Sequence, residues 1–446
     1  MKNTSIFRIF FYGLIIILSI HTINAKGQWY QQTLPVDPEI IFCMKFFNQN
    51  TGWMATGSWQ TSYMPKILKT TDGGNNWYVL RDSTEMYYFQ VLDSVTLYGR
   101  VRCANNYEAI FRTFNGGLTW DSVSRKQGWA HNGHFFFNKD TGYVGSSDGD
   151  SGYVYKTTDG GVTLTQLYRN GNAKMGGNMF FFKQNVNGLY TGYCTGLPYM
   201  YKTTNSGNNW EVISGVFPQP HGLYFLNKDT GWVSNIHGDA VIQHTTNGGV
   251  NWTNQYTSLF STCFTGDIYF SSYNRGWAGS ADGYFIYTTT TGGQVWGRQT
   301  TPNQRTPLIY FSDSLHGWNY SGFQSAPYLS KTTNGGGVII GITKNTSGNI
   351  PLNYVLEQNY PNPFNGSTVI EYSLVKKSTI GMNIYDITGR SIYEITANNQ
   401  EAGSYKLRID FGTLNLTSGT YFYKFIAVNE HGLQQFSGTR KMIYLK

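Results

Sequence analysis

The chain has 446 residues, of which 40% are hydrophobic, 17% aromatic and only 13% charged, and it contains 52 glycines. Its length suggests two or three domains, and its composition is typical of a β-rich, turn-rich extracellular protein. The net charge of +8 is mildly basic, and no run of five or more lysines and arginines occurs, which argues against a nucleic acid partner.

The first 25 residues have the pattern of a signal peptide. Lys2 and Arg8 flank an apolar run from Ile9 to Ile20, and Ile23 to Ala25 is an acceptable cleavage site. The run is short for a membrane span, so an uncleaved anchor is the weaker alternative. We expect a mature chain that starts near Lys26 and has no transmembrane segment.

Four cysteines are spread over four different repeats of an exported chain. None of them has the spacing of a zinc site, so we expect no metal there. Their pairing is left open, and buried free thiols are the favoured interpretation. They are Cys43, Cys103, Cys194 and Cys263.

A short phrase recurs seven times, and its clearest copy runs from Thr70 to Trp77. Successive copies are 42 to 46 residues apart. A fixed period of this length suits one four-stranded blade of a β-propeller, so seven copies predict seven blades. The Asp position of the phrase falls at Asp72, Asn115, Asp159, Asn205, Asn247, Thr291 and Asn334.

The residue types at this Asp position favour a structural role in a turn. An Asp or Asn side-chain oxygen accepts backbone N–H bonds from the turn that follows, and the Gly pair allows positive φ. Asn occupies four of the seven positions and Thr one, a change that turn capping tolerates and acid–base chemistry does not. We therefore expect a structural role at all seven.

A second landmark precedes each phrase, and its first copy runs from Phe46 to Trp53. It marks a strand, a hairpin turn and the next strand, which gives four strands per repeat. The last repeat lacks its Trp, but the segment that starts at Trp29 resembles the missing strand. We expect residues 26–340 to form an all-β, seven-bladed propeller that its own N-terminal strand closes.

The phrase resembles the Asp-box of sialidase-type (BNR) repeats, and its pairing with the second landmark resembles the photosystem II assembly factor (Ycf48-like) propellers. The resemblance covers about Gln28 to Gly337 and implies a fold rather than a function. Sialidases and endo-acting polysaccharide hydrolases use similar propellers. The Phe-Arg-Ile-Pro signature of sialidases is absent, and the similar Phe7 to Phe10 lies in the signal peptide.

Catalysis is the alternative that this resemblance raises. A two-carboxylate glycosidase needs an acid and a partner in one groove. Glu39, Glu85 and Asp267 lie in or just before inner strands, but their spacing selects no pair. A glycoside hydrolase, sialidase-like or endoglucanase-like, stays the alternative function, and we assign no catalytic residue and no cofactor.

The C-terminal part has no Asp phrase. Residues 341–353 are polar and Gly-rich and are expected to be a linker with few contacts around it, and residues 354–446 to form a small Ig-like β-sandwich. Its predicted strands are Thr368 to Ser373, Thr379 to Tyr385, Ser404 to Asp410, Tyr421 to Val428 and Gly438 to Tyr444.

Four motifs in this part resemble the type A C-terminal sorting domain of the type IX secretion system. They are Leu356 to Asn365, Ile384 to Arg390, Leu416 to Tyr423 and Lys441 to Lys446. Gly366 departs from the family, which usually has Pro there. The resemblance implies the outer-membrane translocon as a partner and a secreted or cell-surface location. Removal of the domain, release and oligomeric state are left open, and an adhesive fibronectin-like module is the alternative.

The activity that we expect of such a propeller is binding, to an anionic glycan or to an envelope protein. Basic and aromatic side chains near the loops of one face suit such ligands. The candidates are Arg81, Arg125, Lys126, Arg169, Lys174, His221, Arg298, Arg305, Trp59 and Tyr63.

Two further sets of polar residues belong to this face. A central channel lined by Asn132, Asn178, His221 and apolar residues would favour binding over catalysis. Asp148 and Asp150 sit in a loop with two carboxylates but without the rest of a calcium site, so a plain hairpin is favoured.

Overall fold

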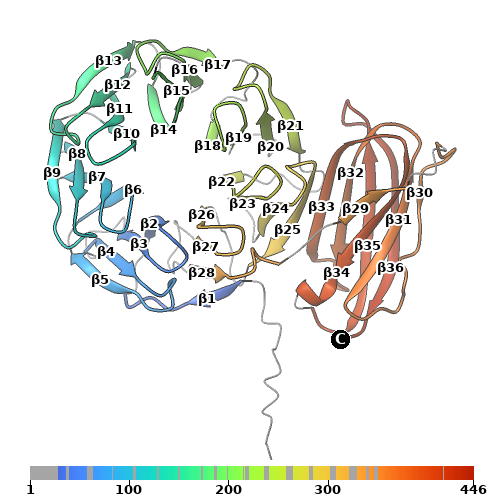
Figure 1. Ribbon diagram of the computed structural model, residues 1–446. Helices are drawn as coiled ribbons and strands as arrows, with labels where there is room; N and C mark the ends of the chain where they lie inside the picture. Colours follow the sequence, from blue (N-terminus) through green and yellow to red (C-terminus); the bar gives the residue numbers. More distant parts are fainter. Residues whose placement is uncertain are drawn as a thin grey trace, which may run out of the picture.

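The computed structural model describes residues 29–446, with gaps at 37–39, 58–63, 83, 104–106, 128–129, 149–150, 172–173, 185–187, 198, 214, 216–219, 236–240, 258–264, 281–284, 302–307, 321–328, 338–340, 346–349 and 415. The expected signal peptide lies outside these residues. The protein is an all-β molecule in which a ring of sheets stands beside a smaller sandwich (Figure 1).

The described strands form seven four-stranded antiparallel blades, of which the first six follow the order of the sequence and the seventh takes its outer strand from the N-terminal segment. Blade one consists of β2 (Ile40–Phe46), β3 (Gly52–Gly57), β4 (Lys66–Thr70) and β5 (Tyr78–Asp82). Blade two consists of β6 (Met86–Val91), β7 (Leu97–Cys103), β8 (Tyr107–Thr113) and β9 (Asp121–Gln127). Blade three consists of β10 (Ala130–Phe136), β11 (Gly142–Asp148), β12 (Ser151–Thr157) and β13 (Thr165–Asn170). Blades four and five are β14 (Lys174–Lys183), β15 (Tyr190–Leu197), β16 (Met200–Thr203), β17 (Glu211–Ile213); β18 (Pro220–Phe225), β19 (Gly231–Asn235), β20 (Val241–Thr245), β21 (Thr253–Thr257). Blade six is β22 (Thr265–Phe270), β23 (Gly276–Ser280), β24 (Phe285–Thr289), β25 (Val295–Thr300), and blade seven has β26 (Leu308–Phe311), β27 (Gly317–Tyr320), β28 (Leu329–Thr332).

The N-terminal strand β1 (Tyr30–Gln32) completes the seventh blade. It pairs antiparallel with β28, with Tyr30 opposite Lys331. Trp29 is buried beside it, its indole Nε1 donates to Gln299 Oε1 at 3.1 Å, and its ring meets Phe311 edge-on. The edge that β28 would otherwise leave open is therefore covered by the start of the described chain.

Neighbouring blades are joined by stacked aromatic rings. The Phe that ends an innermost strand stacks on the aromatic residue that opens the second strand of the preceding blade, and each such pair adds about 1 kcal/mol beyond area burial. Val91 takes the Phe position in the second blade. The pairs and centroid distances are Phe46–Trp318 (3.6 Å), Phe136–Tyr98 (3.6 Å), Phe181–Tyr143 (4.1 Å), Phe225–Tyr193 (3.8 Å), Phe270–Trp232 (3.6 Å) and Phe311–Trp277 (3.9 Å).

The Asp phrases form the turns between the third and fourth strands. In the first copy, Asp72 Oδ1 accepts the backbone N–H of Asn76 at 2.9 Å and the Thr70 hydroxyl at 2.9 Å. Asn115 and Thr291 accept the equivalent backbone N–H in their copies, at 3.0 and 2.9 Å. Asp, Asn and Thr thus supply the same oxygen to the same turn.

This geometry makes a prediction for Asp72. Replacing Asp72 by Asn should leave both ligand binding and stability almost unchanged, because Asn supplies the same acceptor elsewhere in the ring. Replacing Asp72 by Ala should lower the free energy of unfolding by about 1 kcal/mol, since the turn loses its acceptor. Denaturant unfolding of both variants measures this. Lost binding at unchanged stability in the Asn variant would contradict it.

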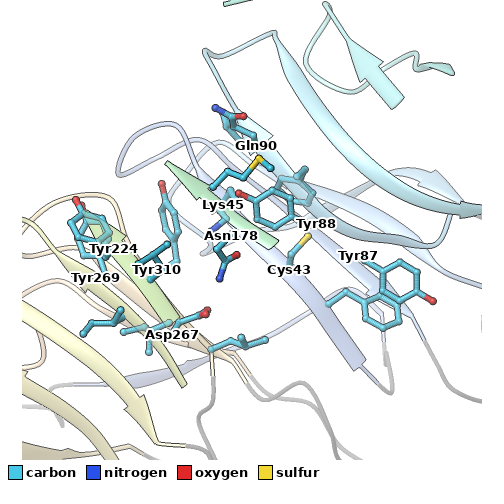
Figure 2. Close-up of a pocket in the computed structure, with 18 of the residues that line it drawn as sticks. Cys43, Lys45, Tyr87, Tyr88, Gln90, Asn178, Tyr224, Asp267, Tyr269 and Tyr310 are labelled. Atoms are coloured by element: carbon cyan, nitrogen blue, oxygen red, sulfur yellow. The ribbon is translucent and has the colours of Figure 1, made fainter. Parts of the chain in front are cut away.

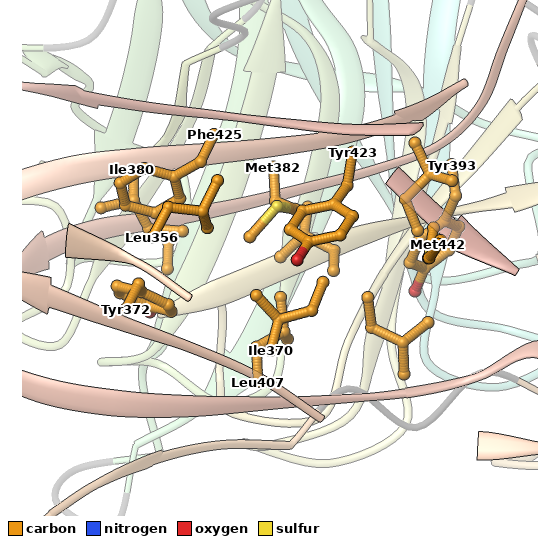
Figure 3. Close-up of a cluster of buried hydrophobic side chains, with 14 of the residues drawn as sticks. Leu356, Ile370, Tyr372, Ile380, Met382, Tyr393, Leu407, Tyr423, Phe425 and Met442 are labelled. Carbon is orange, nitrogen blue, oxygen red and sulfur yellow. The ribbon is translucent and has the colours of Figure 1, made fainter. Parts of the chain in front are cut away.

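The C-terminal residues form a two-sheet sandwich. One sheet has the order β29 (Gly341–Lys344), β34 (Gly403–Asp410), β31 (Ser367–Leu374), β30 (Val355–Leu356), and the other contains β33 (Ser391–Gln400), β32 (Ser378–Tyr385), β35 (Gly419–Val428), β36 (Gln434–Tyr444). A short 3-10 turn, η2 (Phe411–Leu414), follows β34. Figure 3 shows the core between the sheets, where Ile370 and Leu407 face Met382 and Phe425.

The sandwich differs from the sequence expectation in three places. Gly341–Lys344, expected to start a linker, form β29 and pair with β34. Strands β30 and β33 were not predicted. Gly366, which stands where the family usually has Pro, has a φ of +79°, which the fixed ring of a proline does not adopt. The domain limits themselves stay a prediction.

The two parts of the molecule share one sheet. Strand β25 of blade six pairs antiparallel with β33, with Val295 opposite Ala397 and Gly297 opposite Ile395. Blade six and the second sheet of the sandwich thus form one continuous eight-stranded sheet, and Figure 1 shows the two parts side by side. The expectation of few contacts between the two parts is wrong, because an outer blade edge accepts a further strand.

Candidate binding site in the central channel

The innermost strands of all seven blades surround a cavity of about 360 Å³. The Phe at the end of each such strand points into the blade interface, so the residue before it points to the channel. These preceding residues, which we call the channel ring, all line the cavity. They are Lys45, Gln90, Phe135, Phe180, Tyr224, Tyr269 and Tyr310.

A second layer lies nearer to the start of the same strands. It includes Cys43, Tyr88, Asn178 and Asp267, which also line the cavity. The channel is therefore mostly aromatic, with an amide, a carboxylate and an ammonium group placed among the rings (Figure 2).

Lys45 is the cation of this channel. Its Nζ lies 5.6 Å from the ring centroid of Tyr88 and 5.3 Å from that of Tyr310. The Tyr310 hydroxyl donates to the backbone oxygen of Phe46 at 2.6 Å, which fixes that ring. Within the described parts of the chain, Lys45 forms no ion pair. The aromatic faces stabilise the ammonium without neutralising its charge.

The tyrosines of the channel stay protonated. Burial raises the pKa of Tyr269 to about 12, and burial also raises the pKa of Tyr224 and Tyr310. The pKa of Tyr88 is raised by burial and by Asp267, against the influence of Lys45. These side chains are neutral hydroxyl groups at ordinary pH, able to donate and accept hydrogen bonds.

The side chain of Cys43 is a protonated thiol. Burial raises its pKa to about 12, so the reactive thiolate is not populated at neutral pH. Among the described residues, Cys43 is a free thiol, and Cys43 and Cys194 are both buried.

Carboxylates are scarce at the channel. Asp267 is the one acidic side chain among the described lining residues. Glu85 lies just before β6 and accepts a hydrogen bond from the Tyr87 hydroxyl at 2.6 Å, while Glu39 lies outside the described residues. The described channel thus holds no pair of carboxylates for a glycosidase mechanism.

Of the ten residues predicted from the sequence for the ligand face, Arg81, Arg169 and Arg298 have described side chains, and none of these three is among the described lining residues of the channel. Arg81 donates to the Thr84 hydroxyl at 2.7 Å, and Arg169 is exposed with its guanidinium 5.8 Å from the Tyr153 ring. The structure places the backbones of Arg125 and Lys126 in β9, of Lys174 in β14 and of His221 in β18. Arg305, Trp59 and Tyr63 lie outside the described residues.

Arg298 needs a correction. It is buried in β25, and its guanidinium forms an ion pair with Glu394 of the sandwich. It therefore does not face a ligand, because the unpredicted strand β33 covers its position.

The other polar residues named from the sequence have mixed outcomes. Asn178 lines the channel, and the backbone of Asn132 lies in β10. Asp148 accepts the Tyr153 hydroxyl through both oxygens at 3.0 and 2.9 Å, and Asp150 lies outside the described residues. Over the described ranges, no group of three or more His, Cys, Asp or Glu side chains is placed to hold a metal ion.

The sequence reasoning missed the channel ring. Its signal was available in five repeats, where Lys45, Phe135, Tyr224, Tyr269 and Tyr310 stand directly before the Phe of the second landmark. In the second and fourth repeats the sequence suggested Phe89 and Phe182 for that position, whereas the strand register puts Val91 and Phe181 there. The alternation of a strand sends the preceding residue to the opposite face from the Phe.

Comparison with known families identifies the sandwich. Residues 358–437 match the family described as secretion system C-terminal sorting domain. The C-terminal part is a type IX sorting domain. It marks proteins that are secreted by that system to the cell surface or the extracellular space, so this chain is exported along the same route. None of the described residues forms a helix with the length and hydrophobicity that a membrane crossing requires.

Solved structures match the propeller in fold. A structure of YCF48 bound to D1 peptide is 17% identical, covers 69% of this chain and 97% of its own, and has a TM-score of 0.50. YCF48 from Cyanidioschyzon merolae is 16% identical, with coverages of 68% and 98% and a TM-score of 0.52. The GH74 enzyme of Niastella koreensis is 13% identical, with coverages of 93% and 74% and a TM-score of 0.52. No curated protein matches the sequence.

Proposed function

We propose that this protein is an exported binding module whose propeller holds an acidic sugar of a surface glycan in its central channel. The observation that carries the proposal is Lys45, a cation set between Tyr88 and Tyr310 in a channel of aromatic rings. A ligand carboxylate suits this site, because Lys45 forms no ion pair within the described residues and would gain a charge-assisted hydrogen bond from such a group.

The rest of the channel suits a sugar. Aromatic faces pack against the apolar faces of sugar rings, and neutral tyrosine hydroxyls with the Asn178 amide offer donors and acceptors to hydroxyl groups. The cavity of about 360 Å³ is within the usual range of small-molecule sites. An acidic patch of an envelope protein is the competing ligand that the test below distinguishes.

The proposal predicts the effect of removing one charge. The full mature chain should bind acidic oligosaccharides on a glycan array and in calorimetry, and much less their neutral counterparts. Replacing Lys45 by Met keeps the aliphatic stem but removes the ammonium, so affinity for the acidic sugar should fall about ten- to a hundredfold. Binding should also weaken as salt concentration rises.

Replacing the exposed Arg169 by Met is the matched control, since it removes a cation outside the channel and should leave affinity unchanged. Equal affinity of the Lys45 variant, or preference for neutral sugars, would reject the site. If the protein binds an acidic protein patch but no sugar, the proposal that its ligand is a glycan would be rejected.

A glycoside hydrolase on the same scaffold is the alternative. It predicts sugar cleavage that is lost when Asp267 is replaced by Asn, the lining carboxylate that would have to take part. We favour binding because Asp267 is the one acidic side chain among the described lining residues, whereas a glycosidase mechanism uses two carboxylates.

A further inference from the structure

Strand β25 belongs to two cores at once. Val295 is buried in the hydrophobic core of the sorting domain, while its neighbour Trp296 is fully buried in the core between blades five and six. The two side chains point to opposite faces because successive residues of a strand alternate. The sorting domain is thus packed against the propeller through a strand that the propeller itself requires.

An ion pair lies inside this junction. Arg298 of β25 contacts Glu394 of β33, and their side chains are only 4% and 1% exposed. The other ion pairs of the described residues have more exposed side chains. The Arg298 guanidinium also lies 5.6 Å from the centroid of the Tyr287 ring in the adjacent strand β24.

Because the ion pair is buried, it selects which strand can pair with β25 as well as stabilising the contact. A buried charge whose partner is removed is strongly unfavourable, because it is neither hydrated nor neutralised. Arg298 and Glu394 therefore suit each other and disfavour other partners at the same edge. Strand pairing supplies the general contact, and the ion pair fixes which strand is accepted.

The connection between the parts adds a second strand. Residues of β29 follow the propeller directly and pair with β34, Ile342 opposite Leu407. A cut on the C-terminal side of β29 would leave this strand inside the sandwich while it remains joined to the propeller.

We propose that the outer edge of blade six is a docking surface for the sorting domain, and that Arg298 and Glu394 form its latch. The latch keeps the domain on the propeller after the chain between them is cut. Release of the propeller then requires separation of β25 from β33 in addition to cleavage.

The test uses the full mature chain with a recognition site for a specific protease inserted after Gly337, before β29. After complete cutting, which a denaturing gel verifies, gel filtration over a dilution series measures whether the two fragments stay together. We expect co-elution at micromolar concentration. Replacing Glu394 by Gln should raise the apparent dissociation constant about a hundredfold or more.

Replacing Lys406 by Gln is the matched control, because it removes the half-exposed ion pair with Glu371 in the same domain and should not promote separation. Hydrogen exchange of the uncut chains adds a second measurement: the Glu394 variant should exchange faster at residues 295–297 and 395–397 only. If that variant does not fold, replacing Arg298 by Gln removes the charge from the other side of the pair and gives the same comparison. Wild-type fragments that separate at micromolar concentration, or equal separation of latch and control variants, would overturn the proposal.

Discussion

Replacing Trp29 by alanine is expected to lower the free energy of unfolding by about 3–5 kcal/mol. The side chain is 2% exposed, its indole donates to Gln299 Oε1, and its ring packs edge-on against Phe311. Alanine would leave a cavity at the seam and an amide oxygen without this donor. The effect is large because the ring of blades is closed only where β1 joins β28.

Chemical denaturation of the purified mature chain measures this effect. Replacing Gln31 by Ala is the control, since that side chain is exposed in the same strand and should change stability by less than about 0.5 kcal/mol. Deleting residues 27–34 should cost more than the single substitution, because a whole strand pairing is lost as well. A truncated chain that melts within a degree or two of the full one would show that the seam does not need β1.

The propeller was predictable because its information is repeated. Seven copies of one phrase and one landmark each mark the same turn and the same pair of strands, so a single ambiguous copy does little harm. The first blade illustrates this: Phe46 and Trp53 predicted a hairpin, and they end β2 and open β3. The closing strand was predictable for the same reason, since the segment that starts at Trp29 resembles the outer strands of the other blades.

The junction was not predictable because its parts are far apart in sequence and unrepeated. Glu394 stands between buried apolar residues of β33, and Arg298 lies in an ordinary outer strand. Considered separately, Arg298 and Glu394 each resemble a charged side chain exposed to solvent. We therefore predicted that Arg298, a long basic side chain near a loop, belongs to the ligand face. A carboxylate in the middle of an apolar strand was the available signal, because such a group is rarely buried without a partner.

Removing residues 354–446 is expected to abolish export in a host with a type IX system. The family match at residues 358–437 lies within this segment, so the propeller would accumulate in the periplasm while little reaches the medium or the cell surface. Cell fractionation with an antibody to the propeller measures this. The variant with Met at position 45 is the control and should be exported normally, because Lys45 lies in the channel and away from the sorting domain.

The structure adds a second consequence to the same truncation. Strand β25 would lose its neighbour β33, Val295 would lose the core that covers it, and Arg298 would lose its carboxylate. The truncated chain should therefore be less stable than the full chain, and its exposed strand edge should favour association at high concentration. Fusing residues 341–446 behind a signal peptide and an unrelated soluble protein separates the two effects, since that cargo should still reach the surface. A truncated propeller that appears normally outside the cell would contradict the role of the sorting domain. A fusion that stays in the periplasm would show that sorting also needs the contact with blade six.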